Sequence, residues 1–78
     1  MNKIINIISV TPLENYQLHI EFEDGLNKKI NVLPFIKNGI SKYILDLNNF
    51  KKVKAENGYV IWDNGYDLCP VFLRELDQ

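Results

Sequence analysis

Hydrophobic and polar residues alternate along residues 16–22 and again, less regularly, along residues 26–32. A period of two with one apolar face is typical of a half-buried strand. Gly25, just before the second run, suits the left-handed position that closes a three-residue hairpin loop. Such a loop places Leu18 opposite Ile30, so that apolar residues face each other across the pair. The pattern predicts an antiparallel hairpin.

Lys28 interrupts the apolar face of this hairpin, opposite Ile20. We expect Lys28 to lie near the sheet edge, with its aliphatic stem buried and its ammonium in water. The apolar run from Ile4 to Val10 predicts a further strand before the hairpin. This run is too short for a membrane-spanning helix, which needs about 20 apolar residues, and it lacks the cleavage site of a secretory signal.

A second hairpin is predicted around Asn57-Gly58, because this dipeptide is the strongest short signal for a hairpin turn. With these two residues as the loop, Ala55 faces Val60 on the apolar side. On the other side Lys52 faces Asp63, which is an opposite-charge cross-strand pair. A uniform apolar face and a charge pair therefore arise from one register.

Helical spacing of apolar residues before the second hairpin predicts a helix over about Ile40 to Asn48. The apolar positions are Ile36, Ile40, Tyr43, Ile44 and Leu47. Near the C-terminus, Pro70 suits the first position of a second helix, where its missing N–H costs nothing. We expect Asp67 to help satisfy the free amides of that helix, because Cys69 is a poor N-cap. The residues expected to face inward are Phe72, Leu73 and Leu76.

These elements follow the order β-β-β-α-β-β-α and predict an α+β fold, with two short helices packed on a small antiparallel sheet of about five strands. Residues 1–78 are expected to form a single domain. A chain of this size buries only about 60% of the surface that its unfolded form exposes, and this buried surface is too small to be shared between two domains.

Composition narrows the class of protein. The single cysteine excludes an internal disulfide framework and a multi-cysteine zinc site, and it fits a reducing compartment. We expect a cytoplasmic protein with no cofactor and no membrane contact. The net charge of -1 argues against nucleic-acid contact through bulk electrostatics. Residues 26–55 are nevertheless basic, with seven lysines against one acid. They could contact phosphates or an acidic partner, or neutralise neighbouring acidic strands.

Two side chains are candidates for chemistry. His19 is expected on the polar face of its strand, either solvated or acting as a ligand or general base. Cys69 is either a small buried residue at the junction of helix and sheet or a nucleophile that pairs with His19. The sequence contains no serine-centred elbow, phosphate loop or paired metal carboxylates. We therefore do not expect an enzyme.

The segment 62–73 admits two interpretations. In the structural one, Trp62 ends a strand in the core, Asn64-Gly65 turns the chain and Pro70 begins a helix. In the functional one, the segment forms a binding corner that offers the amides of a helix start to a polar group. The residues of this corner are Trp62, Gly65, Tyr66, Asp67 and Pro70.

The pattern W-x-x-G-x-D-L-x-P-x-x-L in this segment, preceded by F-x-D-G in the first hairpin, resembles a family of small bacterial proteins, domain of unknown function 2442. Val71 stands where that family usually has a small or acidic residue, which leaves the helix start less well capped. The family has no established activity. Some members resemble an N-terminal domain that is joined to a helix-turn-helix domain. We expect no helix-turn-helix domain in a chain that ends at Gln78. Many are encoded beside another small protein in what looks like a toxin–antitoxin pairing.

The favoured hypothesis is a non-enzymatic interaction module whose exposed sheet surface or edge binds another protein or a second copy. If the partner is a toxin, this chain is the antitoxin-like member. The alternative is a small-ligand or nucleic-acid-associated regulatory domain that uses the corner at Trp62 to Pro70. A third hypothesis, an enzyme, requires Cys69 close to His19.

Overall fold

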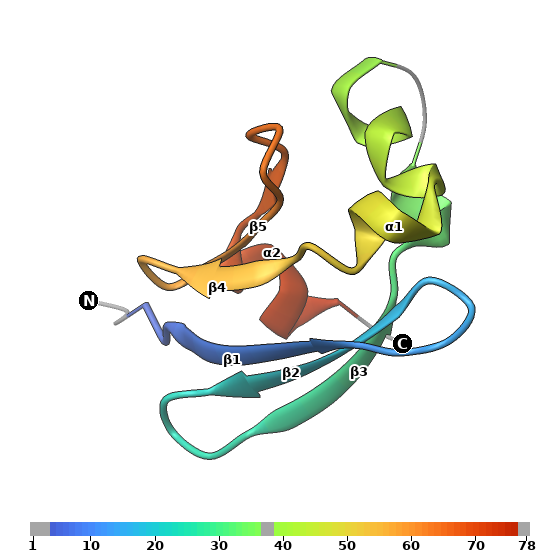
Figure 1. Cartoon of the computed structure of the whole chain (residues 1–78). Coiled ribbons are helices and arrows are strands. Elements are labelled where there is room, and N and C mark those ends of the chain that lie inside the picture. The colour runs from blue at the N-terminus through green and yellow to red at the C-terminus, as the bar shows by residue number, and fades with distance from the viewer. Residues whose placement is uncertain (1–3, 37–38, 77–78) are drawn as a thin grey trace.

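Figure 1 shows a computed structural model of the chain, which describes residues 4–36 and 39–76. Within these residues, six strands form two three-stranded antiparallel sheets. The strands are β1 (Ile7–Pro12), β2 (Gln17–Phe22), β3 (Asn27–Asn31), β4 (Lys54–Glu56), β5 (Tyr59–Ile61) and β6 (Asp67–Leu68). The helices are the 3-10 helices η1 (Leu33–Phe35) and η2 (Gly39–Leu45) and the α-helices α1 (Leu47–Phe50) and α2 (Pro70–Glu75). The α+β class is confirmed, with six strands in two sheets in place of about five in one.

The first sheet has the order β1-β2-β3 and contains the first predicted hairpin. Leu18 pairs with Ile30, as expected. The Phe22 N–H donates to the Leu26 carbonyl oxygen at 2.8 Å, and Gly25 closes the three-residue loop with a φ of 94°. The predicted register is therefore confirmed.

The first strand begins at Ile7, not at Ile4 as predicted. Asn6 lies before the strand and binds Glu23 instead. Its carbonyl oxygen accepts from the Glu23 N–H at 2.9 Å, and its own N–H donates to the Glu23 carboxylate at 3.1 Å. These bonds tie the chain before β1 to the loop of the first hairpin. A bulge between Ile7 and Ser9 then shifts the register of β1 against β2.

The second sheet has the order β4-β5-β6. Ala55 pairs with Val60 around the Asn57-Gly58 turn, as predicted. The third strand, β6, pairs Leu68 with Val60 and was not predicted, since two residues are too few to show a period of two. The two sheets meet where β1 and β4 lie side by side, and there the Ile7 N–H donates to the Gly58 carbonyl oxygen at 3.0 Å (Figure 1).

The prediction of one continuous helix over Ile40 to Asn48 is wrong, because the chain forms two separate helices there. The chain forms η2, passes through Asp46 in an extended conformation with ψ of 120°, and starts again as α1. The Asp46 carboxylate accepts from the Asn48 N–H at 2.9 Å and so caps α1. This restart breaks the predicted apolar face: Ile44 is buried, whereas Leu47 is 52% exposed.

The second predicted helix, α2, begins at Pro70 as expected. Its buried face runs through Pro70 and Leu73, which are three residues apart and share one side of the helix. Phe72 lies off that face and is 43% exposed, so its predicted inward orientation is wrong. Its ring packs edge-on against Phe35 of η1, with the centroids 5.3 Å apart.

Two residues of the first hairpin hold α2 in place. The Lys28 ammonium donates to the carbonyl oxygens of Leu73, Arg74 and Leu76 at 2.8, 2.9 and 2.8 Å. The expectation that this ammonium lies in water is therefore wrong, because the free carbonyls at the end of a helix attract a cation. Arg74 in turn makes two hydrogen bonds to the Asp24 carboxylate, at 3.2 and 2.6 Å.

The core contains side chains from both sheets and from the helices that cover them. The buried hydrophobic residues are Ile7, Leu18, Ile20, Phe22, Ile30, Val32, Ile44, Phe50, Val53, Val60, Trp62, Leu68 and Leu73. The side chain of Ile40 lies outside what the structure describes. Among the described residues, no helix has both the length and the apolar character needed to cross a membrane.

Candidate functional site

Trp62, the largest residue of the predicted corner, belongs to the core. Its side chain is 1% exposed, and its indole N–H donates to the Phe50 carbonyl oxygen at 3.0 Å. The indole also packs against the Tyr66 ring at a centroid distance of 5.5 Å. Trp62 therefore joins the second sheet to α1, and its polar atom is already satisfied within the protein.

Residues 62–66 form the turn between β5 and β6. The Trp62 N–H donates to the Tyr66 carbonyl oxygen at 2.9 Å, and the Tyr66 N–H donates to the Asn64 side chain at 3.2 Å. Gly65 occupies the left-handed position with a φ of 93°. The loop of the first hairpin, residues 22–26, is built in the same way. The F-x-D-G and W-x-x-G patterns thus encode two copies of one turn.

Asp67 and Pro70 complete the corner. Asp67 pairs with Ile61 in β6 and is exposed, and among the described residues no hydrogen bond links its carboxylate to the amides of α2. The expected capping by Asp67 is therefore not formed. Burial raises the pKa of Tyr66, and the neighbouring Asp67 carboxylate adds to this effect. Asp67 also lines a shallow hollow of about 330 Å³ on the outer face of the second sheet, beside Tyr59. Ligand binding at this corner remains a prediction.

His19 and Cys69 lie in different parts of the fold. His19 is partly exposed on β2, between Thr11 and Lys29 of the neighbouring strands. Cys69 is a free, half-buried residue at the N-cap of α2, after the last strand of the second sheet. No hydrogen bond joins the two among the described residues, which also contain no group of three or more His, Cys, Asp or Glu placed to hold a metal ion.

Several lysines of the basic segment have partners within the molecule. Lys52 lies 3.7 Å from Asp63, so the predicted cross-strand pair forms. A hydrogen bond from Tyr43 to the same Asp63 carboxylate raises the pKa of Tyr43. Lys54 pairs with Glu56 at 3.1 Å. Lys37 lies outside the described residues.

Lys29 and Lys51 differ from these lysines, because neither has an ion-pair partner within the part of the chain that the structure describes. Both line an open groove of about 900 Å³ between α1 and the loop that joins β1 to β2. Lys29 reaches it from β3, whereas Lys51 immediately follows α1. The two cations thus come from different elements of the fold.

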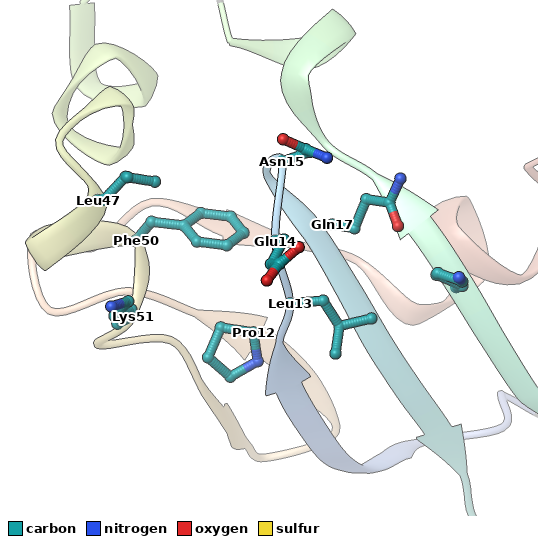
Figure 2. A pocket seen from close by; sticks show the side chains of 9 residues that line it. Pro12, Leu13, Glu14, Asn15, Gln17, Leu47, Phe50 and Lys51 are labelled. Carbon is teal, nitrogen blue, oxygen red and sulfur yellow. The ribbon is translucent and has the colours of Figure 1, made fainter.

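The apolar part of the groove is made by four side chains, which Figure 2 shows from close by. Phe50 is 1% exposed and forms the floor. Leu47 on α1 and Leu13 after β1 stand at the rim, 52% and 38% exposed, and Pro12 lies next to Leu13. The remaining lining is polar and consists of Glu14, Asn15, Gln17, Lys29 and Lys51. The sequence did not predict this site, because its walls come from distant segments.

One wall of the groove rests on a strained turn. Asn15 and Tyr16 both have left-handed backbones, with φ of 59° and 60°. Asparagine tolerates this conformation, but for a residue as bulky as tyrosine it costs roughly 1–2 kcal/mol. The Tyr16 hydroxyl donates to the Leu45 carbonyl oxygen at 2.6 Å, and its ring packs edge-on against Phe50 at 5.4 Å. These contacts hold the turn against α1 and η2 in spite of the strain.

The model of one protein family, described as protein of unknown function (DUF2442), matches residues 7–77. The chain belongs to this family. The expected resemblance to domain of unknown function 2442 is confirmed, and the match includes all six strands and both α-helices. Comparison with curated proteins and with solved structures gave no significant match. Membership of the DUF2442 family therefore places the chain among related proteins and assigns no activity to it.

Proposed function

We propose that this DUF2442 chain is a non-enzymatic protein-interaction module that binds its partner through the groove between α1 and the β1–β2 loop. One observation carries the proposal: Leu13 and Leu47 stand exposed at the rim of an open groove floored by Phe50. Exposed apolar side chains around a concave surface are typical of sites that bind other molecules.

The outer face and the free edge of the first sheet support a contact less well. The outer face of the first sheet carries polar side chains, among them Thr11, His19 and Glu21. Its free edge, β3, bears the exposed Lys29, and a lysine on an edge strand discourages strand-to-strand pairing. The groove, with apolar and charged side chains together, is therefore preferred over the sheet surface or edge.

The partner is another protein or a second copy of this chain. The antitoxin-like role implied by the family resemblance is the specific form of this proposal, in which the partner is a toxin encoded by the adjacent gene. The alternative, a small-ligand or nucleic-acid-associated regulatory domain, would use the hollow beside Asp67. The carboxylates of Glu56 and Asp67 both line that hollow and disfavour phosphate groups there.

The test is co-expression with the protein encoded by the adjacent gene, with the complex measured by size-exclusion chromatography and light scattering. The groove variant carries Leu13→Ser and Leu47→Ser. The matched control carries Leu26→Ser and Leu33→Ser, which are 39% and 45% exposed on other surfaces. Loss of a buried leucine costs about 1.5–3 kcal/mol, so the groove variant should weaken the complex at least tenfold and the control should not.

A self-complex of the wild-type chain that only the groove variant dissociates supports the proposal equally, with a second copy as the partner. A chain that stays monomeric and binds nothing contradicts it. A complex that both double variants weaken equally also contradicts it, because the groove would then have no special part in binding.

A further inference from the structure

We propose that the groove receives an extended, acidic segment of a partner protein, with an aliphatic side chain between Leu13 and Leu47 and carboxylates on Lys29 and Lys51. This inference rests on the proposed function and names the chemistry of the partner segment.

The charges of the groove favour carboxylates. Lys52 and Lys54 lie beside acids of their own chain, and Lys28 is bound by carbonyl oxygens. Lys29 and Lys51 lack such partners among the described residues, although both line the groove. Glu14 also lines it, so the lining has a net charge of one positive unit. A segment with negative side chains toward both lysines complements this surface.

The apolar side chains set the second requirement. Leu13 and Leu47 are exposed on either side of the buried Phe50, so an aliphatic side chain from the partner would pack between the two leucines (Figure 2). The volume of about 900 Å³ is near the upper end of the range for small-molecule sites. An open groove of this size suits a few residues of extended chain.

Nucleic acid is a poorer match to the same lining. Bases bound by single-strand binders stack on exposed aromatic rings, whereas Phe50 is 1% exposed and packs against Tyr16 and Trp62. The one arginine of the chain, Arg74, lies in α2 and binds Asp24. Glu14 would also repel phosphates in the groove.

The experiment measures binding of a fluorescent peptide of alternating glutamate and leucine to the full chain by anisotropy. Two further peptides replace the glutamates with lysine or the leucines with serine, and a short single-stranded oligonucleotide is a fourth probe. The groove variant carries Lys29→Gln and Lys51→Gln. The control carries Lys42→Gln and Lys54→Gln, which changes the net charge equally at exposed positions.

The glutamate–leucine peptide should bind most tightly, and the groove variant should weaken it about fivefold or more, against less than twofold for the control. Equal binding of the lysine–leucine peptide, or equal effects of the two variants, overturns the inference. Oligonucleotide binding with the same dependence on Lys29 and Lys51 overturns it in favour of phosphate recognition.

This result is separable from the test of the proposed function. If the acidic peptide fails to bind while a protein complex still depends on Leu13 and Leu47, the inference fails and the interaction module stands. If neither the peptide nor any protein depends on the groove, both proposals fail.

Discussion

Lys28 and Leu73 are 45 residues apart in sequence, yet the Lys28 ammonium lies 2.8 Å from the Leu73 carbonyl oxygen. Two further carbonyls of the same helix end, at Arg74 and Leu76, accept from this ammonium. A single side chain of the first hairpin thus satisfies the end of α2, a helix of six residues. Helices this short have little stability in isolation, so the contact matters more than it would on a long helix.

Lys28→Met keeps the length of the stem and removes the charge. We expect it to lower the free energy of unfolding by about 1.5–3 kcal/mol, because the carbonyls lose a charged donor. Lys29→Met is the matched control, since Lys29 is exposed on the same strand and should change stability by less than about 0.5 kcal/mol. Urea unfolding followed by circular dichroism measures both, and equal losses would contradict the assigned role.

Trp62→Phe tests the link between the second sheet and α1. The variant leaves the buried Phe50 carbonyl without its donor and leaves a small cavity in the core. We expect a loss of about 2–4 kcal/mol. Tyr59→Phe, an exposed aromatic position on β5, the strand that precedes Trp62, is the control and should stay within about 0.5 kcal/mol of wild type. Thermal and urea unfolding give the two values, and a Trp62→Phe protein as stable as the control would rule out this link.

The hairpin glycines should differ in their tolerance of a side chain. Gly65 has a φ of 93° and open space around it, so Gly65→Ala should cost only the backbone strain, about 1–2 kcal/mol. Gly58 has a φ of 85°, and an added Cβ would clash with the Asn6 side-chain oxygen. Gly58→Ala should therefore cost more than Gly65→Ala. Combining it with Asn6→Ala should recover part of that excess, and no recovery would show that the crowding is unimportant.

Acid should weaken the contact between the first hairpin and α2. The hydrogen bonds from Arg74 lower the pKa of Asp24 in the folded chain, whereas in an unfolded chain it is about 3.9. The contribution to stability is therefore fully present above about pH 5 and is lost as the pH falls through the folded-state pKa. Asp24→Asn should reduce the urea midpoint at neutral pH and converge on wild type in strong acid.

The same comparison in an Arg74→Leu background is the control for Asp24. There the effect of Asp24→Asn should be small at neutral pH, because the partner that lowers the pKa has been removed. A pH dependence that survives in this background would assign it to other carboxylates.

Sequence patterns predicted the parts of the fold that depend on near neighbours. The period of two and the position of Gly25 determined the pairing of Leu18 with Ile30, and the Asn57-Gly58 dipeptide placed the second hairpin. Both signals lie within a few residues of the structure they specify.

The errors arose where a capping residue or a distant partner changed the outcome. Asp46 restarts the helix and so turns Leu47 outward, although the spacing placed Leu47 on the buried face. Lys28 was expected in water because its partners, the carbonyls of α2, are distant in sequence. Treating Asp46 as an N-cap would have been the available signal for the first error.

The groove was the hardest feature to predict for the same reason. Its walls come from residues 12–17 and 47–51, and no local periodicity relates the two segments. Tyr16 adopts a backbone that its residue type disfavours, so propensity pointed away from the turn that builds one wall. The residues of the predicted corner, by contrast, are close together in the sequence and lie at the junction of β5, β6 and α2.

The pair between Asp24 and Arg74 closes a loop of 50 residues and so bears on how the chain folds. Loop closure of this length must be achieved before the contact contributes, which slows folding relative to structures made of local contacts. The first hairpin and α2 should consequently reach their native positions in the same step. Neither the first hairpin nor α2 is then expected to be stable without the other. We expect folding and unfolding each to occur as a single cooperative transition.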